Sequence, residues 1–215
     1  MDPKLCIPQF EESEIKFRRC PIGEWSTPII DVYVLLKAAA GFGAKRILEL
    51  GSYRGDTARL IAENTADDVR ICAVDIHPEH GGSYLNTPAA KKIERKVGKI
   101  TQELFSSGEK YDFIFVDADH DYKSVLNDTA VALEVLAERG VIFWHDYHFH
   151  SYFNGMSGIP EALKHFAARH PIVALGGTTL AMSSRYPGWE TAKLLEAEKG
   201  KNVSGNVWQD TKVRG

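Results

Sequence analysis

"RILELGSYRGDTARLIAEN" occupies residues 46–64, and its pattern decides the fold. A short apolar run at 46–50 is followed by a turn with glycines at positions 51 and 55, and then by a stretch typical of a helix. An apolar run that stops at glycine predicts a buried strand. A strand that passes through a tight turn into a helix is the first half of a parallel β-α-β unit.

The same strand-then-helix order recurs along the chain. Further strands are expected at 70–75, 111–117 and 141–145, with a weaker one near Val97. Helices are expected at 26–41, with Ser26 or Thr27 as the cap, at 122–140, closed by Gly140, and at 158–170. Residues 171–177 and 178–183 suit an antiparallel pair of strands. This alternation predicts an α/β fold with a doubly wound, mostly parallel, Rossmann-like sheet that has helices on both faces.

Composition limits the class of protein. The 215 residues, 44% hydrophobic and 26% charged, predict one main domain at 44–183, a helical cover at 1–43 and a polar tail at 184–215. A net charge of −3 without a basic run argues against nucleic acid binding. No apolar run reaches the roughly 20 residues of a membrane helix. Three cysteines without metal or redox spacing, and a start unlike a signal peptide, predict a cytoplasmic protein.

Polar residues stand where the expected strands end. These are Glu49 and Gly51, then Asp75, then Asp117 with Asp119 and His120 close behind, and finally His145 and Asp146. In parallel sheets of this kind, ligands bind outside the carboxyl ends of the strands. The clusters at 117–121 and 145–150 are therefore expected to meet at one edge of the sheet.

The first turn indicates which ligand binds there. A dinucleotide site requires the spacing G-x-G-x-x-G, whereas this turn has G-x-x-x-G with Tyr53 in place of the middle glycine. Glu49 places a negative charge where a phosphate would be repelled and a cation attracted. Asp75, at the end of the second strand, suits the hydroxyls of a ribose. A ligand with a ribose, an amine and no phosphate fits this pattern, and S-adenosylmethionine is such a ligand.

Three segments also carry a resemblance to a known family. "ILELGSYRGDTA" and "AVDIHPE" resemble the first two motifs of class I S-adenosylmethionine-dependent methyltransferases. Residues 111–147, with their D-x-D-H…H-D-Y pattern, resemble methyltransferase family 24 and the metal-dependent O-methyltransferases of the catechol and caffeoyl-coenzyme A type. The similarity covers roughly residues 44–182 and implies a seven-stranded sheet.

The resemblance implies roles for individual residues. The expected cofactor contacts are Glu49, Gly51, Ser52, Tyr53 and Gly55 around the methionine part, Asp75 and Ile76 at the ribose, Gly98 and Lys99 near the adenine, and Asp117. Asp117 and Asp146 match the acids that bind a divalent cation. The chain departs from the pattern at Tyr147, where the catechol-type enzymes have asparagine, and at His145, where related sugar methyltransferases have an acid.

The chemistry of O-methylation agrees with these roles. The acceptor oxygen must lose its proton, and a divalent cation such as Mg²⁺ lowers the pKa of a bound hydroxyl. His120 is the expected base, with Asp119 and His145 as its rivals. His145 or Asp119 would be a third metal ligand beside Asp117 and Asp146. Asp121 is more simply explained as a helix N-cap than as a catalyst.

The expected function is thus a metal-assisted O-methyltransferase acting on a small hydroxylated molecule. The first alternative is a metal-independent methyltransferase in which His120 or His145 acts alone. The second is a binding protein that holds S-adenosylmethionine without catalysis, and the third is a nicotinamide oxidoreductase, which the glycine spacing opposes. The acceptor's identity and assembly into a homo-oligomer stay open.

Overall fold

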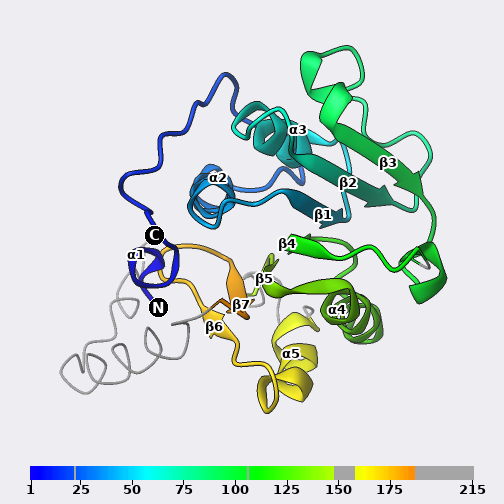
Figure 1. Cartoon of the computed structure of the whole chain (residues 1–215). Coiled ribbons are helices and arrows are strands. Elements are labelled where there is room, and N and C mark those ends of the chain that lie inside the picture. Colours follow the sequence, from blue (N-terminus) through cyan, green and yellow to red (C-terminus); the bar gives the residue numbers. More distant parts are fainter. Residues whose placement is uncertain (22, 106, 148–157, 187–215) are drawn as a thin grey trace, which may run out of the picture.

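A computed structural model describes residues 1–21, 23–105, 107–147 and 158–186 (Figure 1). The elements follow in the order α1 (Pro3–Cys6), α2 (Ile29–Gly41), β1 (Arg46–Leu50), α3 (Asp56–Glu63), β2 (Arg70–Asp75), the 3-10 helix η1 (Pro88–Lys92), β3 (Ile93–Val97), the 3-10 helix η2 (Gln102–Phe105), β4 (Tyr111–Val116), α4 (Tyr122–Val135), β5 (Leu136–Trp144), α5 (Ile159–Ala167), β6 (Val173–Ala174) and β7 (Ala181–Ser184). The weak strand predicted near Val97 is present as β3.

The strands form one seven-stranded sheet in the order β3-β2-β1-β4-β5-β7-β6. Strands β1 to β5 are parallel, whereas β7 is antiparallel to both β5 and β6. The predicted doubly wound, mostly parallel sheet and its antiparallel pair at the end are therefore confirmed. The strand order reverses direction between β1 and β4, which is the switch point where ligands bind in such sheets.

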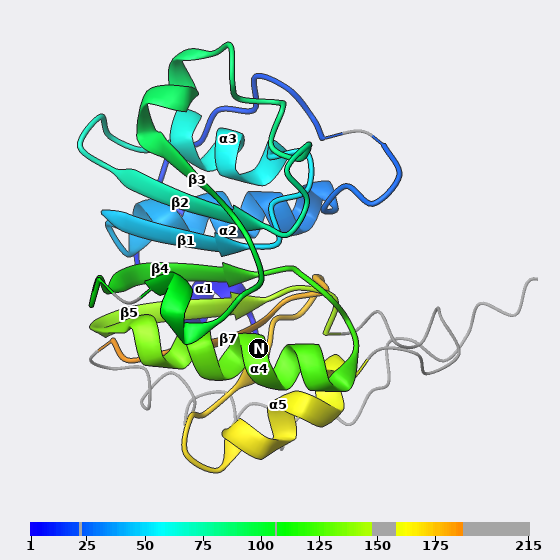
Figure 2. The same cartoon turned by 90° about the vertical axis from the view of Figure 1, so that its right-hand side faces the viewer.

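Helices cover both faces of the sheet (Figures 1 and 2). On one face, the buried apolar side chains of α1, α2 and α3 pack against alternate residues of β1, β2, β4 and β5. On the other face, α4 and α5 pack against the remaining side chains of the same strands. Strands that are apolar on both sides, such as β4, are expected where both faces are covered.

The end of α4 differs from the sequence prediction. The helix ends at Val135, and residues 136–140 already belong to β5. Leu136 pairs with Tyr111 of β4 and is buried against the sheet. Pairing with a strand distant in sequence thus overrides the helical propensity of the local sequence. Gly140 consequently lies inside a strand instead of closing a helix.

Of the two predicted helix N-caps, that of α4 is confirmed and that of α2 is wrong. Asp121 is the N-cap of α4, and its carboxylate accepts a hydrogen bond from the backbone N–H of Lys123 at 3.2 Å. The N-cap of α2 is Pro28, and neither Ser26 nor Thr27 caps this helix with its side chain. The Thr27 hydroxyl instead lies 3.2 Å from that of Thr57 and is directed toward the site described below.

The register of the central strands brings the predicted site residues together. Leu50, Val116 and Trp144 end β1, β4 and β5 and lie side by side in the sheet. The residues that follow them, Gly51, Asp117 and His145, therefore share one edge, as expected. Among the described residues, no helix combines the length and apolar character of a membrane span. The division at residues 43 and 183 stays a prediction, and residues 187–215 of the expected tail lie outside the described part.

Candidate functional site

Two adjoining cavities open at the carboxyl edge of the sheet. The first, of about 700 Å³, runs from the glycine turn past the ends of β2 and β3 to the first turns of α4. The second, of about 680 Å³, lies between the glycine turn, the segment before α2 and the residues after β5. Four residues line both cavities and so form the wall between them: Gly51, Tyr53, Asp117 and Ala118.

Both glycines of the first turn have backbone conformations that favour glycine. Gly51 has φ +89°, and a Cβ atom there would lie 2.1 Å from the carbonyl oxygen of Asp117. Gly55 has φ +81° and caps α3, and a Cβ atom there would lie 2.5 Å from the ring of Tyr84. The chain after β4 therefore approaches the glycine turn as closely as backbone allows, and this contact builds the wall.

Asp75 lines the first cavity with its carboxylate already held in place. One oxygen accepts a hydrogen bond from the backbone N–H of Tyr53 at 2.7 Å. The other accepts from the backbone N–H of His77 at 2.9 Å and lies 2.9 Å from Nδ1 of His80. A fixed carboxylate with lone pairs to spare can accept hydrogen bonds from ribose hydroxyls without reorganising.

Glu49 presents an unusual carboxyl group to the second cavity. Burial, followed by the nearby charge of Asp117, raises its pKa well above the usual value, although a hydrogen bond from the backbone N–H of Ala58 opposes the shift. Its Oε2 atom is buried and has no hydrogen-bond partner. A buried carboxyl oxygen of this kind requires a donor, and the ammonium group of an amino acid moiety supplies one. The carboxyl group of Glu49 is therefore suited to the amino acid end of S-adenosylmethionine.

The remaining predicted cofactor contacts are distributed over the two cavities. Asp75, Ile76, Gly98 and Lys99 line the first cavity only, Glu49 and Ser52 line the second only, and Gly51, Tyr53 and Asp117 line both. Gly55 lines neither and acts by shaping the turn. Asp128 on α4 is a further lining residue of the first cavity, and burial raises its pKa to about 6.

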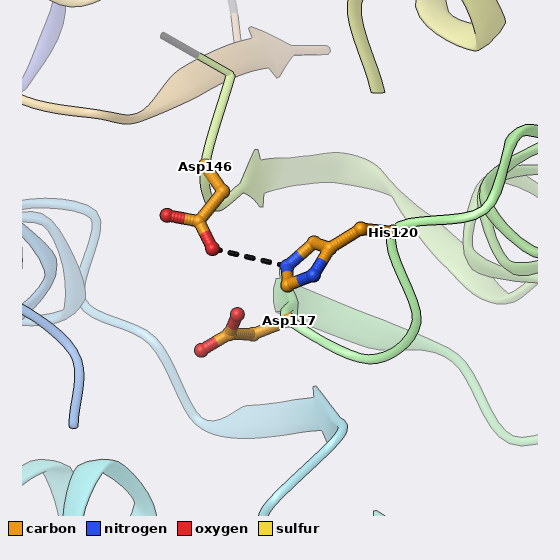
Figure 3. Close-up of side chains that lie close together, drawn as sticks. All are labelled: Asp117, His120 and Asp146. Atoms are coloured by element: carbon orange, nitrogen blue, oxygen red, sulfur yellow. Dashed lines mark ion pairs between the residues drawn. The ribbon is translucent and has the colours of Figure 1, made fainter. Parts of the chain in front are cut away.

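Two acids and a histidine converge in the second cavity (Figure 3). Asp117 follows β4, Asp146 follows β5, and His120 lies in the loop before α4. The Nε2 atom of His120 lies 3.0 Å from Oδ2 of Asp146. This contact with Asp146 raises the pKa of His120 above its usual value. Burial alone would raise the pKa of Asp146, but the ion pairs with His120 and His145 outweigh burial and lower the pKa overall.

His145 lies beneath this cluster, with carboxylates on both sides of its ring. Its Nδ1 atom is 2.9 Å from Oδ1 of Asp117 and 3.3 Å from Oδ2 of Asp146. Its Nε2 atom is 3.2 Å from Oδ2 of Asp31, an acid of α2 that is fully buried. Burial alone would lower the pKa of His145, but the three carboxylates outweigh it and raise the pKa well above its usual value.

Asp119 is placed differently from the other predicted catalytic residues. Its carboxylate accepts hydrogen bonds from the hydroxyl of Ser124 at 2.7 Å and from the backbone N–H of Asp121 at 3.2 Å. The bond from Ser124 is the main reason why its pKa is lowered. Asp119 lines the first cavity, whereas His120, His145 and Asp146 line the second.

One subset of these residues could hold a divalent cation. Ligand atoms of Asp117, His120 and Asp146 lie within 4.8 Å of one another, a spacing that a single cation can span after small side-chain movements. The set contains an imidazole, which suits Mn²⁺ or Zn²⁺ better than Mg²⁺. His145, the third ligand expected from the sequence, directs both ring nitrogens at carboxylates instead.

The comparisons with known proteins agree with this geometry. A family model described as a methyltransferase domain, methyltransferase family 24, matches residues 48–147. Residues 48–147 of the chain are thus similar to a methyltransferase domain. The resemblance inferred from the sequence and the predicted class, a class I S-adenosylmethionine-dependent methyltransferase, are confirmed. No curated protein sequence matches the chain at a significant level.

Solved structures show the same methyltransferase fold. An O-methyltransferase from Bacillus cereus in complex with SAH has a TM-score of 0.61 and 19% identity, covering 75% of this chain and 84% of that one. The O-methyltransferase TomG from Streptomyces achromogenes, in complex with SAM, has a TM-score of 0.62 and 16% identity, covering 84% and 87%. A candidate caffeoyl-CoA O-methyltransferase from Staphylococcus aureus has a TM-score of 0.60 and 16% identity, covering 74% and 85%.

Several residues of the methyltransferase site were not predicted from the sequence. Trp25 and Thr27 line the second cavity, and their segment gives no clear pattern. Asp31 interrupts an apolar helix, and an acid in such a position is the one signal that was available. Of the four non-glycine residues with positive φ in the described ranges, three line the second cavity: Trp25, Tyr53 and Asp146. Strained backbone of this kind clusters at functional sites.

Proposed function

We propose that this methyltransferase transfers the methyl group of S-adenosylmethionine to a hydroxyl oxygen of a small molecule bound in the second cavity. The observation that carries the proposal is the wall shared by the two cavities, with the cluster of His120, Asp117 and Asp146 on the acceptor side. The cofactor's sulfonium supplies a methyl group that an oxygen can attack once its proton is leaving. The protein's remaining task is to orient the acceptor and to take up that proton.

His120 is the proposed proton acceptor. The ion pair between its Nε2 atom and Asp146 favours a proton on that nitrogen, which leaves Nδ1 to take up the acceptor's proton. The ring is only partly buried and borders the second cavity, so an acceptor can reach it. Asp119 is a weaker choice because its carboxylate is engaged by Ser124 and borders the first cavity.

Asp75 and Glu49 would hold the two ends of the cofactor. Asp75 would accept from the ribose hydroxyls in the first cavity, next to Ile76, with Gly98 and Lys99 farther along near the adenine. The unpartnered Oε2 of Glu49 would accept from the cofactor's ammonium group. Because a positive charge stabilises the ionised form, Glu49 would lose its proton when the cofactor binds.

A second version of this function includes a divalent cation, and the spacing of Asp117, His120 and Asp146 favours it. A cation bound there would lower the pKa of a coordinated acceptor hydroxyl. Repulsion between Asp117 and Asp146 does not by itself require a metal, because His145 lies within 3.3 Å of both. His120 would then be a ligand, and it could not serve as the base at the same time.

A methylation assay separates these versions. The protein is incubated with S-adenosylmethionine labelled in the methyl group and a panel of small phenols, sugars and amines, and products are identified by mass spectrometry. We expect O-methyl ethers, and full activity in excess chelator if His120 is the base. Loss of activity in chelator that Mn²⁺ or Mg²⁺ restores would establish the cation version. An absence of methylated products from a protein that binds S-adenosylhomocysteine would contradict catalysis and favour a binding protein.

The cytoplasmic location stays a prediction, and the oligomeric state stays open.

A further inference from the structure

Asp31 is a buried acid that neither cavity uses. It lies in the first turn of α2 and is completely shielded from solvent. Burying a carboxylate, like burying any ion, costs on the order of several kcal/mol. The cost is offset only when charged or hydrogen-bonding partners replace the lost water. An acid in the apolar stretch of a helix therefore needs a reason, and its contacts supply one.

The partners of Asp31 come from two distant parts of the chain. The backbone N–H of Thr179 donates to Oδ1 at 3.1 Å, and the Thr179 hydroxyl donates to Oδ2 at 2.6 Å. The Nε2 atom of His145 lies 3.2 Å from the same Oδ2. The first two bonds hold the carboxylate in one orientation, and that orientation faces the imidazole.

His145 connects the fixed carboxylate of Asp31 to the two acids of the candidate site. Its Nδ1 side faces Oδ1 of Asp117 at 2.9 Å and Oδ2 of Asp146 at 3.3 Å. Its ring also meets Phe115 edge to face, with centroids 5.9 Å apart, which restricts rotation of the ring. Because Asp31 holds the imidazole of His145 on one side, the imidazole can in turn hold the carboxylates of Asp117 and Asp146 on the other side.

We propose that Asp31 is a positioning residue of the methyltransferase, which acts through His145 to hold the carboxylates of Asp117 and Asp146 at the wall between the two cavities. This inference deepens the proposed function and rests on it for its catalytic consequence. It also assigns His145 a role other than that of a base or a metal ligand, because each ring nitrogen already faces a carboxylate. The helical cover would thus contribute directly to the geometry of catalysis.

A simpler role for Asp31 is to tie α2 to the turn before β7 through Thr179. The two roles predict different results for Asp31→Asn, which preserves the shape of the side chain but removes its charge. Asp112→Asn is the matched control. Asp112 is a partly buried acid that likewise ties two elements together, since it accepts from the backbone N–H groups of Lys45 and Arg46 at 3.0–3.2 Å, at the opposite edge of the sheet.

The test begins with proton NMR of the imidazole N–H groups in the complex with S-adenosylhomocysteine. His145→Gln identifies the two exchange-protected signals of His145. We expect Asp31→Asn to shift or remove both signals and Asp112→Asn to leave them unchanged. If Asp31→Asn fails to fold, Asp31→Glu is measured instead, and its longer side chain should displace the same signals. Unchanged signals in the folded variant would overturn the proposal.

The catalytic consequence is measured as a double-mutant cycle on any acceptor that is methylated. Asp31→Asn should lower kcat by roughly 10–100-fold, as expected for a misplaced reaction site. The affinity for S-adenosylhomocysteine should change by less than about 3-fold, far less than kcat. In the His145→Gln background the same substitution should have little further effect, whereas fully additive losses would overturn the proposal. If no acceptor is methylated, the proposed function fails while the NMR result still decides the positioning role.

Discussion

Gly51→Ala tests whether the wall between the cavities is built as described. The substitution places a Cβ atom 2.1 Å from the carbonyl oxygen of Asp117 and 2.5 Å from Cα of Ala118, both of them backbone atoms that cannot rotate away. The backbone after β4 must therefore shift by about 1 Å to restore an ordinary contact, and shifts of this kind cost about 1–3 kcal/mol. The positive φ of +89° adds strain of about 1–2 kcal/mol.

Gly43→Ala is the matched control for the strain alone. Gly43 also has a positive φ, +63°, but a Cβ atom there meets nothing within 4 Å. The two variants therefore share the strain and differ by the clash, about 1–3 kcal/mol. For a protein of this size, this difference corresponds to a melting temperature lower by roughly 2–12 °C in Gly51→Ala than in Gly43→Ala.

The same shift should have a functional effect, because Asp117 and Ala118 line both cavities. We expect Gly51→Ala to weaken binding of S-adenosylhomocysteine at least about 10-fold and to slow methyl transfer by about 100-fold. Gly43→Ala should change neither. Calorimetry measures the melting temperature and the binding on the same samples. Equal melting temperatures and equal affinities in the two variants would refute the close contact between the glycine turn and the end of β4.

Three further predictions follow from single side chains. Asp75→Ala should weaken S-adenosylhomocysteine binding by on the order of 1–3 kcal/mol, and an unchanged titration would remove Asp75 from the cofactor site. His120→Ala should lower turnover by roughly 10²–10⁴-fold with little change in cofactor affinity. Because Asp146 raises the pKa of His120 and the neutral ring is the active form, the wild-type rate should rise with pH to a midpoint above 6.5; a rate independent of pH in this range would contradict the role. Burial raises the folded-state pKa of Asp128 to about 6, so the folded state favours the neutral carboxyl group. The contribution of Asp128 to the free energy of unfolding is therefore fully present below pH ~4 and is lost as pH rises through about 6. Asp128→Asn should therefore raise the free energy of unfolding by roughly 2–3 kcal/mol at pH 7.5 and by much less at pH 4, and an equal effect at both pH values in denaturant titrations would rule this out.

The sheet could be predicted because its strands are apolar on both faces and end at glycine or an acid. The bounds of β1 and β2 agree with the prediction to the residue. The end of α4 could not be predicted, because residues 136–139 favour a helix locally and become a strand only by pairing with β4. The local sequence pattern at 136–139 does not indicate that β4 is the pairing partner.

The acids and histidines at the strand ends could be predicted for the same reason, but their contacts could not. Strand order places Asp117 and Asp146 at one edge, whereas the orientation of His145 depends on Asp31, which lies 114 residues earlier. Asp119 was a plausible base by its position in the sequence, and only the structure shows that its carboxylate is engaged by Ser124. Side-chain direction in a loop thus decides roles that residue types alone leave open.

Calorimetric titration with S-adenosylhomocysteine and, separately, with NADH decides which class of ligand the site binds. We expect the Glu49 carboxyl, the G-x-x-x-G turn and the fixed carboxylate of Asp75 to select a ligand with an amine and a ribose and without phosphate. We predict binding of S-adenosylhomocysteine in the micromolar range, with release of a proton from Glu49, whose pKa burial raises, and no comparable binding of NADH. Binding of NADH without binding of S-adenosylhomocysteine would contradict the account.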